Sequence, residues 1–340
     1  MSGPFVHHID PVLPLVGSIG GVYLWWYGLS YTLGFLHVLL YVRSRRHALG
    51  LSRREAYALA SCFSAGVLIG GRAIQVAFDE WPLYGANPQL LPAFWLGGMA
   101  THGLLIGALA ATLAYSWWKG VPFLELADAL VIPGALLLGL GRLGNFIDGQ
   151  IVGRVTDVSW AVKFPDADGF RHPVVLYDGL KNLLLVPYLL RVRRTNRTPG
   201  AVAARFVFWY AALRIVIDLT RDYPTFRLAL GTGQTLNIVM MLLGLVLLYR
   251  SRLRRQGRLG ARPSTVPRRP RADDEAPTIA QRAAFAALLL VCLTIPSNWT
   301  QDVPVRYADR HHGMTRTWLY PRIETALYRR ETITRESDRR

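Results

Sequence analysis

A few ionisable side chains interrupt otherwise apolar stretches of this 340-residue chain, and their types suit chemistry on an anionic substrate. An ionisable group inside a membrane is costly, so each one is a candidate for function. His102 lies in the uncharged stretch 81–118, close to Gly98 and Gly103. Its neutral imidazole is suited to accept a proton as a general base. The alternative is a histidine that only forms a hydrogen bond between two helices.

Arg142 and Asn145 belong to the glycine-rich polar stretch 141–150, which follows an apolar run. The planar guanidinium of arginine offers a fork of donors that fits a phosphate group. The Asn145 amide and the glycine N–H groups would add donors to the same oxyanion. The alternative is a tight loop at the membrane surface in which Arg142 is only an interfacial anchor.

Arg214 and Asp218 are four residues apart in an apolar stretch, which places them on one face of a helix. Either they form an internal ion pair, or Asp218 orients Arg214 towards a phosphate. Arg72 follows two glycines and either reaches the outer surface or joins the same anion site. His172 and Asp178 are interpreted as supporting groups at the start of a further apolar stretch.

The elements that must position these side chains are apolar helices. Hydrophobic residues make up 51% of the chain and charged residues 18%, below the proportion usual for a soluble domain. Several uncharged runs reach the length of about 20 residues that a bilayer span requires. We expect an all-α, polytopic integral membrane protein with a small outward-facing loop domain. The eight candidate spans are 11–42, 56–78, 94–118, 126–141, 173–190, 206–219, 228–249 and 283–301.

The charges alternate between successive connections. The chain has 39 Lys and Arg against 22 Asp and Glu, a formal net charge of +17, and the basic residues gather in the connections 43–54, 119–120, 191–197 and 250–282. The positive-inside rule places these connections in the cytoplasm and the N-terminus outside. This distribution explains most of the basic excess, and no nucleic-acid-binding module accompanies it.

The sequence divides near residue 250. We expect a transmembrane domain at 1–250, a basic cytoplasmic linker at 251–282, an additional transmembrane or interfacial helix at 283–296 and a polar tail at 297–340. If the additional helix crosses the membrane, the tail lies outside; if it lies in the interface, the tail stays inside. Adjacent histidines such as His7 and His8 do not share a face, so we predict no metal site, and the two cysteines form no motif.

An ordered series of blocks resembles the bacterial prolipoprotein diacylglyceryl transferase family. The most specific block is GRLGNFIDGQIVGR at 141–154, and the resemblance covers about residues 10 to 250. The other blocks are DPVLPLVGSIGGVYLWWYGLSY at 10–31, GGR at 70–72, GGMATHGLLIG at 97–107, RHPVVLYD at 171–178, YAALRIVIDLTRD at 210–222 and GQTLNIVMMLLG at 233–244.

This resemblance implies transfer of the diacylglyceryl group of phosphatidylglycerol to the lipobox cysteine of a prolipoprotein, with release of glycerol 1-phosphate and without a cofactor. It implies seven transmembrane helices in the bacterial inner membrane, to which the eighth span is an addition, and an active site facing the outer leaflet. It assigns Arg142 and Arg214 to the lipid headgroup and marks His102 as the candidate for taking the thiol proton. It also marks Tyr27, Asn145 and Gly153 as site residues, and we place Asp148, Gln150, Asp218 and Arg72 around the headgroup.

Two departures from the family pattern suggest alternatives. Asp148-Gly149-Gln150 stands where the family usually has Asn-Gly-Glu, and Asp218 stands where it usually has a glutamate. If the missing glutamate is needed for chemistry, the chain is a catalytically silent paralogue that binds lipid or lipoprotein. The ionisable groups inside the spans also allow a transporter of anionic substrates, although no internal repeat is visible.

Overall fold

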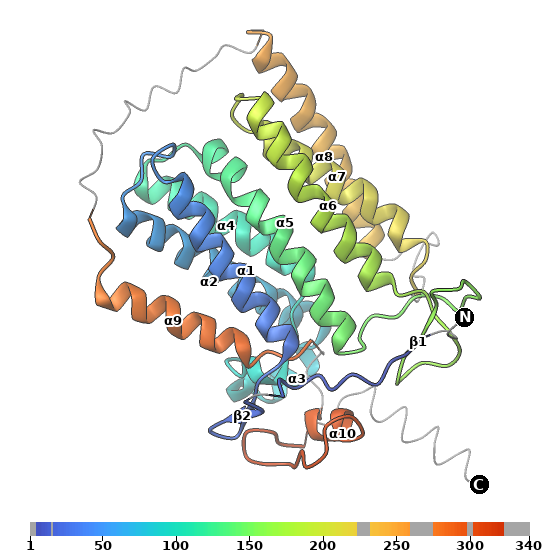
Figure 1. The fold of residues 1–340 in the computed structure, drawn as a ribbon. Coiled ribbons are helices and arrows are strands. Elements are labelled where there is room, and N and C mark those ends of the chain that lie inside the picture. Colours follow the sequence, from blue (N-terminus) through green and yellow to red (C-terminus); the bar gives the residue numbers. More distant parts are fainter. Residues whose placement is uncertain (1–4, 15, 223–231, 259–274, 298–301, 323–340) are drawn as a thin grey trace.

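The structure is a bundle of antiparallel helices (Figure 1). It is a computed structural model that describes residues 5–14, 16–222, 232–258, 275–297 and 302–322. The longer helices are α1 (Trp26–Arg45), α2 (Arg53–Ile74), α4 (Thr101–Lys119), α5 (Phe123–Ile147), α6 (Val174–Thr195), α7 (Ala201–Asp218), α8 (Thr232–Arg255) and α9 (Ile279–Leu293). The short elements are β1 (Phe5–Val6), β2 (Ser18–Ile19), β3 (Val22–Tyr23), η1 (Gln75–Asp79), α3 (Trp81–Ala86), η2 (Pro88–Leu90), η3 (Phe94–Leu96), β4 (Val162–Lys163) and α10 (Val303–Tyr307).

Each of the eight apolar spans coincides with one of these longer helices, which confirms the all-α fold. The helices α2, α5 and α8 are long and apolar enough to cross a membrane on their own. Leucine and valine side chains on the outer faces of several helices are exposed, as expected of surfaces that meet lipid. How many helices cross the membrane stays a prediction. Parts of span 228–249, of the linker 251–282 and of the tail 297–340 lie outside the described residues.

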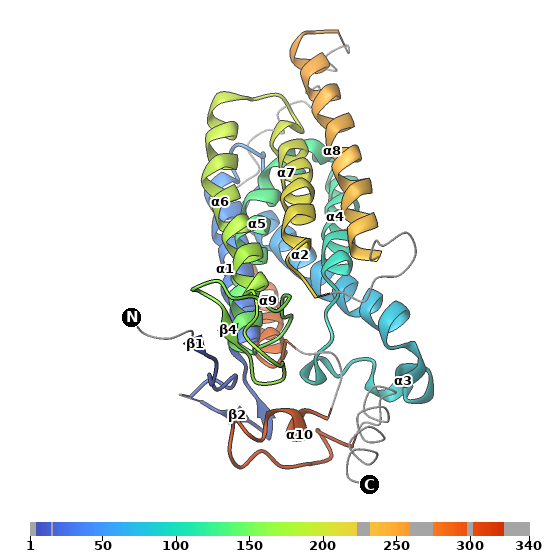
Figure 2. The same ribbon diagram turned by 90° about the vertical axis from the view of Figure 1, so that its right-hand side faces the viewer.

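Short connections fix the direction of neighbouring helices. The connections after α1, α4 and α6 contain few residues, so each next helix turns back beside the previous one (Figures 1 and 2). Local signals set the helix starts: Ser52 and Glu55 form a capping box at α2, and the Asp128 carboxylate of α5 accepts the N–H groups of Gly200 and Val202 at α7. As a result, the starts of α1, α4, α6 and α8 share one end of the bundle with the ends of α2, α5 and α7.

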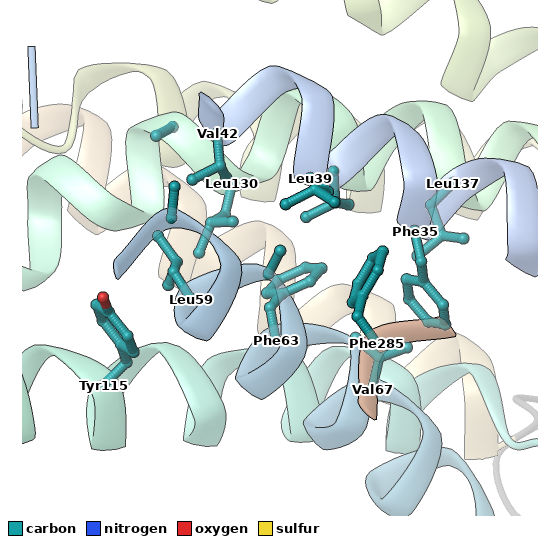
Figure 3. Close-up of a cluster of buried hydrophobic side chains, with 14 of the residues drawn as sticks. Phe35, Leu39, Val42, Leu59, Phe63, Val67, Tyr115, Leu130, Leu137 and Phe285 are labelled. Carbon is teal, nitrogen blue, oxygen red and sulfur yellow. The ribbon is translucent and has the colours of Figure 1, made fainter. Parts of the chain in front are cut away.

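The largest core lies between α1, α2, α4, α5 and α9. Figure 3 shows aromatic and branched side chains from these helices interleaved in one layer. It includes Phe35, Leu39, Phe63, Val67, Tyr115, Leu130, Leu137 and Phe285. Because α9 contributes Phe285 to this layer, the helix is part of the folded bundle and not a detached addition.

Glycines let α2 and α4 touch. A Cβ atom built on Gly107 would lie 2.0 Å from the Gly66 carbonyl oxygen, and one on Gly103 would lie 2.3 Å from the Gly70 oxygen. Both helices therefore present a glycine every four residues to the other, the pattern that allows close helix packing in membranes. This contact fixes the start of α4, which carries His102.

The end of the bundle where α5 and α7 finish is covered by irregular segments. The N-terminal segment, the loop 79–100 and residues 302–322 share a small hydrophobic cluster that includes Val12, Trp25, Leu96, Tyr307 and Tyr320. Figure 2 shows these segments gathered at the end opposite the far end of α8. The strands β1 and β4 pair in parallel register beside them. This covered end holds the polar residues singled out in the sequence.

Candidate active site

The Asp178 carboxylate at the start of α6 is the centre of a buried ion cluster. Its Oδ2 atom lies 2.6 Å from the Arg142 Nε atom of α5 and also accepts from the Arg214 guanidinium of α7. Its Oδ1 atom lies 2.7 Å from the Lys181 Nζ atom. The side chain of Asp178 is 1% exposed. Asp178 therefore supports the two arginines, in keeping with the role expected from the sequence, and it also joins α5, α6 and α7 through their charges.

A second carboxylate holds Arg214 from the other side. The Arg214 Nε atom lies 3.1 Å from the Asp218 Oδ1 atom one helical turn away, and the Asn237 amide of α8 donates to the Asp218 Oδ2 atom at 3.2 Å. The predicted placement of Arg214 and Asp218 on one helix face is confirmed. The pair is internal, and it orients the guanidinium towards Asp178 and Arg142.

The cluster is rich in cations. Among the described residues, its ion pairs join three cations, Arg142, Arg214 and Lys181, to two carboxylates, Asp178 and Asp218. The Lys181 ammonium also lies 3.9 Å from the centre of the Tyr210 ring. Guanidinium and ammonium groups gathered at one buried place favour the binding of an anion.

A glycine brings α6 close enough to α5 for this cluster to form. A Cβ atom on Gly179, next to Asp178, would lie 3.1 Å from the Cβ atom of Arg142. A larger residue at this position would push the two helices apart and lengthen the Arg142–Asp178 contact. The sequence pointed to Arg142, but the role of Gly179 in allowing its close approach to Asp178 is recognisable only from the packing.

The stretch 141–147 is helical, so the alternative interpretation of it as a tight surface loop is wrong. Helix α5 continues to Ile147, and the chain leaves it through a Schellman motif in which the Gln150 N–H donates to the Asn145 carbonyl and Gly149 has a φ of 68°. The glycine at 144 serves packing: a Cβ atom there would lie 2.7 Å from the Tyr27 Cα atom. Arg142 and Asn145 thus stand on a rigid helix.

Asn145 connects the ion cluster to other parts of the chain. Its Oδ1 atom accepts from the Arg142 NH1 group at 3.0 Å, and its Nδ2 group donates to the Ser297 hydroxyl at 2.5 Å. The buried phenol of Tyr27 shares a hydrogen bond with Tyr31 and lies within electrostatic range of Arg142 and Asn145. The structure therefore brings Tyr27, Arg142, Asn145 and Arg214 into one region, as predicted.

His102 lies in the first turn of α4 and faces the same region. Thr101 next to it accepts from the Arg142 NH2 group at 3.2 Å, and the His102 ring is within electrostatic range of Arg214, Asp218 and Arg142. Within the described residues the ring makes no hydrogen bond, so it does not act as the helix-linking histidine of the alternative interpretation. A half-buried imidazole beside an anion-binding cluster is suited to take a proton from a bound substrate.

Arg72 has other partners. Its buried guanidinium donates to the carbonyl groups of Gly97, Ala93 and Leu90 and lies 4.8 Å from the centre of the Tyr84 ring. Arg72 therefore holds the loop 79–100 in place over the end of α2. These contacts do not support the expectation that Arg72 joins the anion site.

Gly153 lies where three backbone segments meet. A Cβ atom on this residue would lie 2.6 Å from the His172 carbonyl oxygen and 2.8 Å from the Thr220 oxygen. Its N–H donates to the His172 carbonyl at 3.1 Å. Gly153 thus joins the loop after α5 to the start of α6 and the end of α7 without a side chain.

Asp148 and Gln150 contact the C-terminal part of the chain. The Asp148 Oδ2 atom accepts from the Ser297 N–H at 2.8 Å, and the Gln150 Oε1 atom accepts from Arg306 at 3.1 Å. Asp148 is 0% exposed, and its burial raises the pKa of the carboxyl group to about 7. Gln150 and Arg306 also line a pocket of about 280 Å³, together with Gly149, Ile151, Val152, Asp166, Arg221 and Asp222.

Sequence reasoning missed Lys181 and Ser297 and gave Asp178 too small a role. Lys181 carried a signal, because it follows Asp178 by three residues inside an apolar helix. Ser297 carried none, because it lies 152 residues from Asn145 in a segment of ordinary composition. Among the described residues, no three His, Cys, Asp or Glu side chains lie together as they would around a metal ion.

The comparisons with known proteins agree on one family. The family described as prolipoprotein diacylglyceryl transferase matches residues 14–250. The phosphatidylglycerol–prolipoprotein diacylglyceryl transferase of Geobacter sulfurreducens is 37% identical over 249 residues, which is 71% of this chain and 94% of that protein. The transferase of the same name from Mannheimia succiniciproducens is 38% identical over 254 residues, 70% of this chain and 94% of that protein. The transferase of the same name from Bordetella parapertussis is 37% identical over 248 residues, which is 69% of this chain and 93% of that protein.

Proposed function

The chain belongs to the prolipoprotein diacylglyceryl transferase family, and we propose that it transfers the diacylglyceryl group of phosphatidylglycerol to a cysteine thiol of a prolipoprotein. The chain covers nearly the full length of its relatives, and the matched region contains every helix of the ion cluster. It is a bacterial membrane enzyme and a transferase. The lipobox of the precursor is the expected acceptor segment.

The observation that carries the proposal is the convergence of Arg142, Arg214 and Lys181 on Asp178 in one buried cluster. The phosphodiester of phosphatidylglycerol is an anion, and three clustered cations attract an anion. The bidentate guanidinium groups of the two arginines suit phosphate oxygens better than a point charge does. Asp178 holds the two guanidinium groups close together.

The reaction exchanges one bond to carbon for another. The thiol sulfur attacks the diacylglycerol CH₂ carbon that carries the phosphate, a C–S bond forms, and the C–O bond to phosphate breaks. The thiol proton passes to a base, and the leaving group is glycerol 1-phosphate. Because negative charge grows on its phosphate oxygens as the C–O bond breaks, arginines placed beforehand lower the barrier.

We assign the proton transfer to His102. A thiol reacts as thiolate and has a pKa of about 8.5 in water, so a nearby base or cation must assist its ionisation. His102 stands at the start of α4, next to Thr101 and across from Arg142 and Arg214. Asn145 and Tyr27 complete the wall of the site. Asn145 orients Arg142, and the Tyr27 phenol presents a donor to the same region.

The remaining proposed headgroup residues act in different ways. Gln150 lines the pocket of about 280 Å³ together with Asp222 and Arg306, and we assign it to the glycerol hydroxyls of the headgroup. Asp218 acts through Arg214, and Gly153 allows the loops around the site to pack. Asp148 is buried against Ser297, and Arg72 is bound to loop carbonyls, so we assign both to the walls and not to the lipid.

The charge pattern supports an outward-facing site in the inner membrane. The ion cluster lies at the end of the bundle opposite the connections that hold Arg43, Arg45, Arg193 and Arg194, and the positive-inside rule places those connections in the cytoplasm. The N-terminus and the site then face the outer leaflet, where the precursor's cysteine emerges from the membrane.

The test is transfer by the purified full chain in phosphatidylglycerol liposomes with a lipobox peptide. Mass spectrometry would detect the diacylglyceryl adduct on the peptide cysteine. We expect an adduct with the wild-type protein and none with His102→Ala or Arg142→Ala. No adduct from wild-type protein that is folded and binds the lipid would contradict the proposal and indicate a silent paralogue.

A further inference from the structure

The C-terminal segment runs along the whole bundle and ends at the candidate active site. Glu275 pairs with Arg54 at the start of α2 at 3.1 Å, and Ser297 pairs with Asn145 near the end of α5. Between them, α9 lies against α1 so closely that a Cβ atom on Gly28 would meet the Cys292 carbonyl oxygen at 2.3 Å. The Trp25 N–H donates to the Leu293 carbonyl at 2.9 Å. This segment lies beyond residue 250, where the match to the family ends.

Several polar contacts join this segment to the end of α5 and the loop that leaves it, and three of them involve side chains on both segments or the Ser297 backbone. The Asn145 amide donates to the Ser297 hydroxyl, the Ser297 N–H donates to Asp148, and Arg306 donates to Gln150. The two positions at which the loop differs from the family pattern thus both have partners in the C-terminal segment.

We propose that residues 275–297 and 302–322 are a working part of the active site and that Ser297 is a positioning residue for Arg142. This inference rests on the proposed function, because the reaction gives Arg142 its task. Ser297 does not contact the reacting atoms. It acts by fixing the Asn145 amide, which in turn fixes the Arg142 guanidinium.

The orientation of the Asn145 amide explains the effect. Arg142 has only donors, so the amide must turn its oxygen towards Arg142 and its NH₂ group away from it. Asn145 is 3% exposed, and a buried NH₂ group without an acceptor is unfavourable. The Ser297 hydroxyl is that acceptor. Without the Ser297 hydroxyl, the Asn145 amide would rotate so that its NH₂ group could bind another acceptor. Arg142 would then lose its hydrogen bond to the Asn145 Oδ1 atom.

Ser297 is held in place from both sides. On one side α9 is bound to α1 by the Trp25–Leu293 hydrogen bond, and on the other side residues 302–322 are anchored to the rest of the covered end. The Trp95 indole donates to the Leu319 carbonyl at 2.8 Å, and the Tyr23 N–H donates to the Tyr320 hydroxyl at 3.0 Å.

The experiment measures transfer by full-length variants at varied phosphatidylglycerol and peptide concentrations. We expect Ser297→Ala to lower kcat/KM for phosphatidylglycerol roughly ten- to hundredfold, the range for a displaced catalytic group, with the KM for peptide unchanged. Ser297→Thr, which keeps the hydroxyl, should restore most of the activity. Thr294→Ala is the matched control, because the Thr294 hydroxyl donates only to the Val291 carbonyl in its own helix.

The double variant decides between a positioning role and a general structural one. If Ser297 acts through Asn145, adding Ser297→Ala to Asn145→Ala causes no further loss. Wild-type activity in Ser297→Ala, or losses that multiply in the double variant, would overturn the inference. Native mass spectrometry measures the affinity of the wild type and of the same variants for phosphatidylglycerol, so it compares them without requiring turnover. If the wild type transfers nothing, the proposed function fails, and equal lipid affinity of wild type and Ser297→Ala would overturn this inference separately.

Discussion

Arg142 and Asp178 meet with only 2.6 Å between the Nε atom and the carboxylate oxygen, and both side chains are almost fully buried. Removing the charge of Asp178 leaves three cations facing one another. We expect Asp178→Asn to lower the free energy of unfolding by about 3–5 kcal/mol, the cost of breaking a buried ion pair. Transfer activity should fall at least about a hundredfold as Arg142 and Arg214 move apart.

The matched control for this variant is Glu275→Gln. The side chains of Glu275 and its partner Arg54 are both more than half exposed. The pair should therefore contribute less than about 1 kcal/mol to the free energy of unfolding. Denaturant unfolding in detergent measures both variants. Equal stability of the two would show that the cluster at Asp178 is not the electrostatic centre of the fold.

His102→Gln should separate catalysis from lipid binding. Glutamine keeps a polar side chain but cannot accept a proton at neutral pH, so kcat should fall by about 10²–10⁴. The KM for phosphatidylglycerol should change little, because the arginines bind the phosphate. The control is His37→Gln, a histidine of α1 that stacks on Tyr41. Steady-state kinetics in liposomes measures both, and a loss confined to KM would assign His102 to binding instead.

The buried Asp148 carboxyl should make stability depend on pH. Its pKa is about 7 in the folded chain against 3.8 for the ordinary side chain, because burial outweighs the N–H of Ser297 and the charges of Arg310 and Arg306. The folded state therefore keeps a proton that the unfolded state releases. The contribution is fully present below pH 3.8 and is lost as the pH rises through 7, at up to about 1.4 kcal/mol per pH unit.

Asp148→Asn tests this dependence. Asparagine is neutral at every pH, so the difference in stability between wild type and variant should shift in favour of the variant from pH 5 to pH 8. Unfolding by denaturant at four pH values measures the shift, and Glu275→Gln, which changes an exposed carboxylate at the opposite end, should leave the wild-type dependence in place. A constant difference across the range would show that Asp148 is solvated.

The contact between α2 and α4 should tolerate no side chain. Gly107→Leu would place a Cβ atom 2.0 Å from the Gly66 carbonyl oxygen, so the helices must separate and carry His102 away from the cluster. We expect a loss of about 1–3 kcal/mol in stability, as for overpacking of a core, together with reduced kcat. Gly134→Ala, where a Cβ atom meets nothing within 4 Å, should be neutral or slightly stabilising. Thermal unfolding of both variants checks the contrast.

The helices were predictable because their signal is local. Apolar runs, some of them with embedded charges, marked all eight, and the spacing of Arg214 and Asp218 gave their shared face. The polar stretch 141–147 was not predictable as helix, because its glycines resemble loop glycines until Tyr27 is seen to pack against Gly144. Local sequence cannot show which helix will face a glycine.

The centre of the site was not predictable for a related reason. Asp178, Arg142 and Arg214 come from three helices, and the sequence does not state which faces turn towards one another. Arg72 is the same residue type as the two arginines of the ion cluster, and the sequence therefore made it a candidate for anion binding. Its actual partners are the backbone carbonyl groups of Ala93 and Leu90, which the sequence does not identify. Residue type indicated candidates, and only packing assigned their partners.

The hydrogen bond between Asn145 and Ser297 joins residues that are synthesised far apart in time. Ser297 leaves the ribosome 152 residues after Asn145, when α1 to α8 have already been made. A nascent chain that has not reached residue 297 has its arginines but lacks the proposed acceptor for Asn145. If Ser297 positions Arg142 as proposed, such a chain would transfer lipid more slowly than the full chain.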